Sequence, residues 1–171
     1  NHLGIEKYLG SVVGSEVPKT WPIEALKAQA VAARTYALQK MGRLKRYDLK
    51  ANEESQIYLG IESETPTTTK AVERTRSLVL THQGKLINAV FHSASGGRTE
   101  SSGDVWKKQL PYLVSVLDYD QETPKHQWAI RFSEDRLIEL FPEIEGVKNI
   151  DLLEISPSGR VLKAKIVRLK G

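Results

Sequence analysis

The stretch from residue 23 to residue 41 constrains the fold of this chain more than any other feature. It contains no Gly or Pro, and Ala, the best helix former, recurs in it at six positions. Pro22 suits a first helical turn, Glu24 complements the helix dipole, and Gly42 supplies a stop signal. The pattern predicts a helix over residues 23–41. Because Ala side chains let other elements approach closely, we expect this helix at the centre of the fold.

The rest of the chain predicts shorter helices and several strands. Apolar residues at helical spacing predict a helix over residues 3–13, and residues 14–18 are expected to be a loop or a frayed helix end. A Thr-Pro-Thr signal predicts a short helix over residues 65–75, and Ser133 is expected to cap another that ends near residue 141. The strand candidates are residues 77–81, 86–93, 111–117, 127–132, 152–155 and 160–169.

The order of these elements indicates the fold class. Helices come before strands without regular alternation, so we predict an α+β fold in a single domain over residues 1–171. The central Ala-rich helix is expected to pack on mixed or antiparallel strands. The abrupt ends of the chain suggest a cut fragment, so the absence of an export signal or an anchor is expected to carry little weight.

Charge and cysteine content narrow the function classes. With 25 basic and 21 acidic residues, the net charge is +4, which suits anionic partners but is far from the dense basic stripe of a nucleic-acid binder. The chain has no Cys, which excludes disulfides, thiolate chemistry and Cys-ligated zinc. Its four His residues are scattered and form no metal-binding pair. We therefore expect no metal, no other cofactor and no nucleic acid.

Arg34 is the most informative polar residue. Leu26, Ala30, Arg34 and Leu38 lie four residues apart, so they stack along one row of the predicted helix. An unpaired guanidinium is very costly to bury, so we expect Arg34 to find a carboxylate or an anionic ligand. The alternative is that its side chain extends from the edge of the apolar stripe into water, or forms a purely structural pair.

Glu16 is the second candidate. Val13 and Val17 flank it, and Trp21 follows shortly afterwards. A carboxyl group in an apolar and aromatic setting resists ionisation and can act as a general acid near neutral pH. The alternative is an ordinary loop glutamate in water, which the spacing alone favours.

The polar loop over residues 92–100 is the third candidate. Its two glycines allow a tight turn or a close approach of the backbone to a ligand, and its hydroxyl groups suit a sugar. A plain turn is the alternative. A Ser-His-acid hydrolase is disfavoured, because His92 and Ser93 are adjacent and the chain has no Gly-x-Ser-x-Gly motif.

Several segments together resemble one bacterial family. Residues 8–18 read YLGSVVGSEVP, and residues 24–36 read EALKAQAVAARTY, a long and specific run. Further motifs follow in order: Gln56-Ile57-Tyr58, Ala71-Val72 with Thr75, Phe91-His92-Ser93, Gly96-Gly97, Thr99-Glu100, Val105-Trp106 and Pro111-Tyr112-Leu113. Together they resemble the SpoIID/LytB domain (stage II sporulation protein D and amidase enhancer). The resemblance is good from about residue 5 to about residue 120. The family's usual final segment is missing, so we expect the domain over residues 1–171 to be truncated at its C-terminal end.

The resemblance implies two possible activities. SpoIID-like members are lytic transglycosylases that cut peptidoglycan between N-acetylmuramic acid and N-acetylglucosamine, leave a 1,6-anhydro end and favour peptide-stripped glycan. LytB-like members enhance a partner N-acetylmuramoyl-L-alanine amidase without being enzymes themselves. A purely structural wall-binding module is a third reading. All three imply a location outside the cytoplasm, in the cell wall or anchored to a membrane.

The resemblance also implies the site. Glu16 falls on the family's catalytic glutamate and Arg34 on its active-site arginine, so Arg34 would orient Glu16 or bind substrate. The expected glycan-binding residues are Gln56, Tyr58, Ser93, Ser95, Gly96, Gly97, Thr99 and Trp106. Some members bind zinc through a Cys and a His near this loop, but Ser95 and Arg98 stand here, so we expect no metal. Glu16, Arg34 and residues 93–99 should share one cleft.

Overall fold

The Ala-rich stretch forms the helix α2 (Ile23–Lys40), which confirms the central prediction. A computed structural model describes residues 2–42, 47–144 and 146–169 of the chain. It divides into two compact units, Asn1–His92 and Ser93–Gly171, here called the first and the second unit. Gly42 has a φ of 74°, a conformation that suits Gly, and the helical pattern stops there as expected. The α+β class is confirmed, with helices beside small antiparallel strand pairs.

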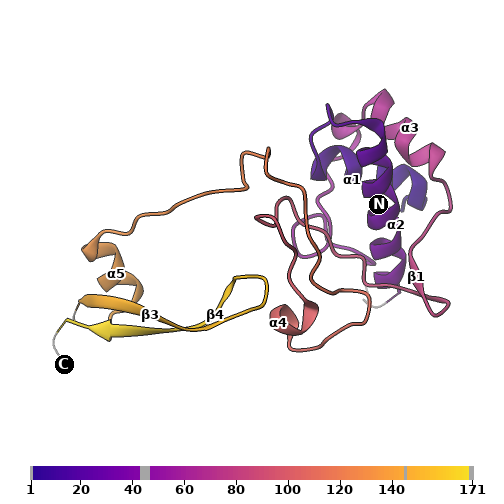
Figure 1. The fold of residues 1–171 in the computed structure, drawn as a ribbon. Helices are drawn as coiled ribbons and strands as arrows, with labels where there is room; N and C mark the ends of the chain where they lie inside the picture. Colours follow the sequence, from indigo (N-terminus) through magenta and orange to yellow (C-terminus); the bar gives the residue numbers. More distant parts are fainter. Residues whose placement is uncertain (1, 43–46, 145, 170–171) are drawn as a thin grey trace. The chain divides into compact units, whose positions relative to one another are not determined.

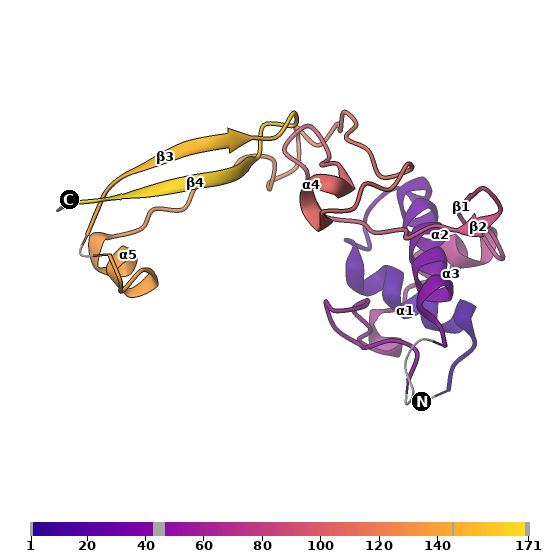
Figure 2. The ribbon, with the colours of Figure 1, turned by 90° about the horizontal axis from the view of Figure 1, so that it is seen from below.

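The first unit is built around three helices. α2 contacts both α1 (Ile5–Glu16) and α3 (Pro66–Arg74), and the three lie together in Figures 1 and 2. Thr65 caps α3 with a capping box, as its sequence predicts. The buried apolar core comes from all three helices and consists of Leu9, Val12, Val13, Leu26, Ala30, Ala33, Ala71 and Val72. The small side chains of α2 therefore allow the close approach that the sequence predicted.

The helix α1 is longer than its sequence suggested. It runs through Gly14 to Glu16, where we expected a loop or a frayed end. The 3-10 turn η1 (Ile61–Ser63) lies against it, because the hydroxyl of Ser63 contacts the hydroxyl of Ser11 at 2.8 Å and also donates to the Ser11 carbonyl. Gly14 therefore allows a close approach of the α1 and η1 backbones and does not end the helix.

Replacing Gly14 with Ala should destabilise the first unit. The new Cβ would lie 1.9 Å from the Ser63 carbonyl oxygen, so η1 would have to move, at a cost of about 2–3 kcal/mol. The matched control is Gly10→Ala, whose Cβ would meet only the side chain of Glu64, at 3.3 Å. We expect that variant to be near neutral, because Ala gains helix propensity. Urea unfolding measures both, and equal effects would contradict the prediction.

The strand pair of the first unit is much shorter than predicted. β1 (Thr81–His82) and β2 (Lys85–Leu86) pair antiparallel around Gln83 and Gly84, so the predicted turn is confirmed. Both turn residues have positive φ, 50° and 73°. The expected strands over residues 77–81 and 86–93 are otherwise irregular, because the described chain offers them no further ladder partner.

The second unit contains the remaining elements. They are α4 (Ser102–Trp106), α5 (Glu134–Leu140) and the antiparallel pair β3 (Val147–Ile155) and β4 (Val161–Arg168). Ser133 caps α5, as its sequence predicts, and the turn over residues 157–159 joins β3 to β4, as the hairpin signal predicts. α5 also contacts β3 (Figure 1). Two predictions are wrong. Residues 127–132 form no strand, and residues 111–117 form only an isolated bridge between Leu117 and Arg98.

No helix in the described parts of the chain combines the length and the apolar character needed to cross a membrane.

Candidate functional site

Arg34 is buried, with 1% of its surface exposed, and its guanidinium is fully engaged. Nε and Nη2 donate to the two carboxylate oxygens of Glu6 at 3.0 and 2.7 Å, a bidentate ion pair. Nη1 and Nη2 also donate to the carbonyls of Ala30, Leu78 and Val72 at 3.5, 3.2 and 3.2 Å. All five N–H groups therefore have an acceptor, and the expectation of a carboxylate partner is confirmed.

The carboxylate beside Arg34 belongs to Glu6 and not to Glu16. The two glutamates stand ten residues apart on α1, a rise of about 15 Å, so Arg34 is placed near the opposite end of that helix from Glu16. Of the two roles that the resemblance implied for Arg34, orienting Glu16 or binding substrate, a direct contact with Glu16 is not formed. The hydrogen bonds from Arg34 lower the pKa of Glu6, although burial acts against them. In this structure Arg34 ties α2 to the start of α1 and to the chain around Leu78.

Glu16 is the last residue of α1 and lines a cavity of about 230 Å³. Its Oε1 accepts a hydrogen bond from the Ile57 N–H at 2.7 Å, which fixes the side chain. Among the described residues, no hydrogen bond engages Oε2. The cavity is also lined by Tyr36, Glu53, Ser55, Ile57, Val90 and Phe91. Tyr36 and Phe91 provide aromatic rings, whereas Glu53 and Ser55 make part of the wall polar, and Trp21, on which the sequence expectation rested, is not among the lining residues.

Gln56 and Tyr58 flank Ile57 in the sequence, and neither is among the residues that line the cavity of Glu16. Gln56 is 1% exposed, accepts a hydrogen bond from the Tyr8 hydroxyl at 3.2 Å and donates to the Ala33 carbonyl at 3.1 Å. Tyr58 stacks on Tyr8, with ring centroids 5.5 Å apart. Burial raises the pKa of Tyr8, and the negative charge of Glu16 adds to this effect. Gln56 therefore acts as part of the core, and the structure gives it no surface for glycan.

The loop with the two glycines lies in the second unit and is organised around Asp120. The N–H groups of Ser95, Gly96 and Gly97 donate to the Asp120 carboxylate at 2.7, 2.8 and 2.8 Å, and His126 contacts it at 2.8 Å. Burial raises the pKa of Asp120, but these hydrogen bonds outweigh it and hold the pKa well below the usual range. Sequence reasoning missed Asp120. The signal in the sequence was the pair Gly96-Gly97, because successive N–H groups in such a turn can bind an anion. In the structure the two glycines have positive φ, 72° and 96°.

Most of the hydroxyl groups predicted to bind sugar are used within the loop region. The Ser95 hydroxyl donates to Asp118 at 2.7 Å, and the Thr99 hydroxyl accepts from the Val116 N–H at 2.9 Å. Ser93 and Gly96 are exposed, and Trp106 at the end of α4 is 54% exposed. The exposed groups remain the surface that this loop region offers to a ligand, while Ser95 and Thr99 maintain its shape.

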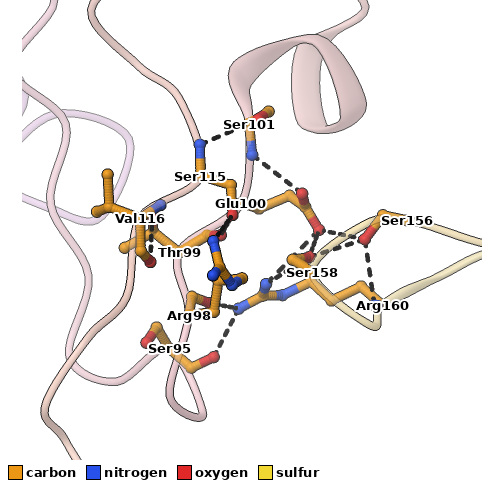
Figure 3. Close-up of polar contacts among 10 residues, drawn as sticks. All are labelled: Ser95, Arg98, Thr99, Glu100, Ser101, Ser115, Val116, Ser156, Ser158 and Arg160. Atoms are coloured by element: carbon orange, nitrogen blue, oxygen red, sulfur yellow. Dashed lines mark hydrogen bonds and ion pairs between the residues drawn. The ribbon is translucent and has the colours of Figure 1, made fainter.

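Glu100 anchors a second polar network, which Figure 3 shows. Its Oε2 accepts from the hydroxyls of Ser156 and Ser158, and Arg160 lies 3.5 Å away. Its Oε1 accepts from the Ser101 N–H at 3.0 Å. Burial raises the pKa of Glu100, but these hydrogen bonds and the charge of Arg160 outweigh it and hold the pKa at about 2.

This lowered pKa predicts that the contacts between Glu100 and the tip of the β3–β4 hairpin weaken when Glu100 is protonated at low pH. The ordinary pKa of 4.5 applies in the unfolded chain, so ionised Glu100 stabilises the fold fully above about pH 4.5, and the contribution is lost as the pH falls through about 2. In an NMR pH titration of the folded chain, the Ser158 and Gly159 amides should shift as Glu100 takes up its proton, with a midpoint near pH 2. Glu100→Gln should remove that shift and leave the acid response of the Asp120 loop. An unchanged Ser158 titration in this variant would contradict the assignment.

The chain is similar to known proteins. A family model described as Stage II sporulation protein matches residues 1–82. The amidase enhancer of Bacillus subtilis (strain 168) is 40% identical over 129 residues, which cover 75% of this chain and 17% of the relative. An uncharacterised protein of Brachyspira hyodysenteriae is 40% identical over 140 residues, or 80% of this chain and 38% of that protein.

A third relative is the stage II sporulation protein D of Bacillus subtilis (strain 168). It is 35% identical over 150 residues, which cover 77% of this chain and 44% of the relative. The chain therefore spans less than half the length of each of these relatives.

Proposed function

The chain belongs to the SpoIID/LytB family, and from this premise we propose that it is a lytic transglycosylase that cleaves peptidoglycan glycan strands. Its substrate would be peptide-stripped glycan, in which it would cleave the bond between N-acetylmuramic acid and N-acetylglucosamine. The reaction would take place outside the cytoplasm. The observation that carries the proposal is Glu16, a carboxyl group held by the Ile57 N–H at the wall of an aromatic-lined cavity. Family membership supports the reaction type, and the geometry supports this residue as the acid.

The chemistry needs one carboxyl group. Protonated Glu16 donates its proton to the glycosidic oxygen, the bond from that oxygen to C1 of the muramic residue breaks, and positive charge develops at C1. The C6 hydroxyl of the same sugar then attacks C1 and returns its proton to Glu16. The products are a 1,6-anhydro end and a free 4-hydroxyl on the glucosamine residue, and no water is consumed. Because the nucleophile belongs to the substrate, the pair of carboxylates used by ordinary glycosidases is not required.

The roles of the other candidate residues follow from their contacts. Arg34, with every donor engaged, would support catalysis by fixing the framework that carries Glu16. Tyr36 and Phe91 on the cavity wall offer ring faces to a sugar. Glu53 shares the cavity with Glu16, and its role can be separated from that of Glu16 by the identity of the product, 1,6-anhydro or reducing ends.

The experiment is a digest of purified glycan, both peptide-bearing and amidase-treated, read by mass spectrometry. Peptide-stripped glycan should yield 1,6-anhydro ends, and peptide-bearing glycan should yield few. Reducing ends in their place would indicate a hydrolase and overturn the proposed reaction.

A second candidate function is supported by the relative named as an amidase enhancer. In this reading the chain binds glycan or a cell-wall amidase and does not cut the glycan itself. An amidase assay with and without the chain tests it. Faster peptide release without anhydro products from a folded, glycan-binding protein would favour the enhancer over the transglycosylase.

A further inference from the structure

The second unit lacks a buried apolar core in the part of the chain that the structure describes. All fully buried large apolar side chains belong to the first unit, whereas the buried side chains of the second unit are Ser102, Asp120 and Ser156. An isolated two-stranded hairpin is marginally stable at best in water. The position of the β3–β4 tip must therefore depend on polar contacts, and these contacts concentrate at one place.

That place is the tip cluster, which we define as Glu100, Ser156, Ser158 and Arg160. Glu100 accepts from both serine hydroxyls, and the Ser156 hydroxyl lies 2.7 Å from that of Ser158. Nη1 of Arg160 donates to the Ser158 hydroxyl at 3.0 Å and lies 3.5 Å from the Glu100 carboxylate. The cluster therefore joins the hairpin tip to the chain at residue 100.

Arg160 extends this connection to the loop before Glu100. Its Nη2 donates to the carbonyls of Ser95 and Arg98 at 2.7 and 3.1 Å, and Figure 3 shows the guanidinium between those carbonyls and the side chains of Ser158 and Glu100. The N–H groups of Ser95, Gly96 and Gly97 all point to Asp120. The loop is thus held from two directions, by a carboxylate on its N–H groups and by a guanidinium on its carbonyls.

We propose that Glu100 and Arg160 are positioning residues for glycan binding, which act by fixing the conformation of residues 95–99 from the tip of the β3–β4 hairpin. This inference rests on the proposed function and on the expectation from the sequence that residues 93–99 contact the glycan. Gly96 and Gly97 adopt positive φ, and Gly loses more conformational freedom than any other residue when its backbone is fixed, so contacts that hold this conformation lower the cost of preforming it. A loop already held in its binding shape avoids the ordering cost on binding, which improves affinity without changing the chemistry.

The test compares Arg160→Gln, Arg160→Lys and Glu100→Gln in the whole chain, with Lys163→Gln and Glu154→Gln as controls. The controls remove the same charges from a cross-strand pair of the same hairpin, on exposed residues that do not reach the loop. Amide hydrogen exchange at Gly96 and Gly97 reports loop order, and circular dichroism confirms folding. The dissociation constant for amidase-treated glycan strands, together with kcat and KM for anhydro product, reports function.

We expect Arg160→Gln to speed exchange at Gly96 and Gly97 and to raise Kd and KM about tenfold, with kcat within about twofold. Arg160→Lys should recover part of this loss, because one ammonium can still reach a carbonyl, and the controls should match wild type. If Arg160→Gln does not fold, Glu100→Gln and Arg160→Lys decide the matter by the same readouts.

Two results would overturn the inference. If wild type binds glycan and the folded Glu100 and Arg160 variants bind it with the same Kd, the positioning role is excluded, but the proposed function is not. Wild type that binds no glycan removes the proposed function and the positioning role together.

Discussion

Replacing Arg34 with Met should be the most destabilising single change in the first unit, with a loss of about 3–5 kcal/mol in the free energy of unfolding. The variant leaves the Glu6 carboxylate without its bidentate partner and the carbonyls of Val72 and Leu78 without their donor. Arg34→Lys keeps the charge but cannot supply five donors in a planar fork. It should lower the free energy of unfolding by roughly half as much as Arg34→Met. Urea unfolding followed by circular dichroism measures each value.

The control for Arg34 lies on the same helix. Lys27 pairs with Glu24 at 2.8 Å, and the Glu24 side chain is 73% exposed. Exposed pairs of this kind contribute about 0–1 kcal/mol, so Lys27→Gln should change the free energy of unfolding by less than about 0.5 kcal/mol. If Arg34→Met loses no more than this control, then Arg34 does not have the framework role assigned to it here.

Arg34 shows that a helical pattern can predict the burial and pairing of a side chain but not the identity of its partner. The four-residue row predicted that a guanidinium would be buried and paired, and both statements are confirmed. The row did not specify which carboxylate would pair with Arg34, because α1 carries two glutamates, Glu6 and Glu16. Glu6 lies three residues before Leu9 and seven before Val13, so it continues the buried row of α1. That periodicity was the signal for the true partner, and Glu16 lies beyond the buried stretch.

Local signals predicted helices better than strands. The starts of α2, α3 and α5 follow from Pro22, the Thr65 capping box and Ser133, because a cap depends only on residues within one turn. Strands depend on a partner elsewhere in the chain. Residues 127–132 alternate as a strand should, yet the described chain provides no ladder for them. The β3–β4 hairpin was predictable because its partner is the adjacent segment, joined by a recognisable turn.

The loop over residues 95–99 illustrates a different limit. Its hydroxyls and glycines suggested direct contacts with a sugar, and a sequence cannot tell a group that faces a ligand from one that faces its own chain. The Ser95 hydroxyl and the loop N–H groups are bound by Asp118 and Asp120, more than 20 residues away. Such long-range acceptors give no local pattern. The structure therefore indicates that the function of this loop depends on the residues that fix its conformation and not only on its own side chains.

Replacing Glu16 with Gln should reduce the formation of 1,6-anhydro ends by at least about 100-fold. Gln has nearly the same shape and can still accept the Ile57 N–H through Oε1, so the α1 terminus and the cavity should be unchanged. The amide cannot deliver a proton to the glycosidic oxygen or take one from the C6 hydroxyl. Mass spectrometry of the digest measures the loss, and the thermal unfolding midpoint shows that folding is intact.

Glu53→Gln distinguishes the one-carboxyl mechanism from its alternative on the same cavity. If the substrate's own C6 hydroxyl is the nucleophile, removal of the Glu53 charge alters binding but leaves anhydro ends as the product. If Glu53 instead activates water, its loss should be as severe as that of Glu16, and wild type should leave reducing ends. Glu16→Gln with full activity would contradict both mechanisms, since each requires this residue as the acid. Parallel measurement of product identity and rate in the two variants therefore decides which group moves the proton and what attacks C1.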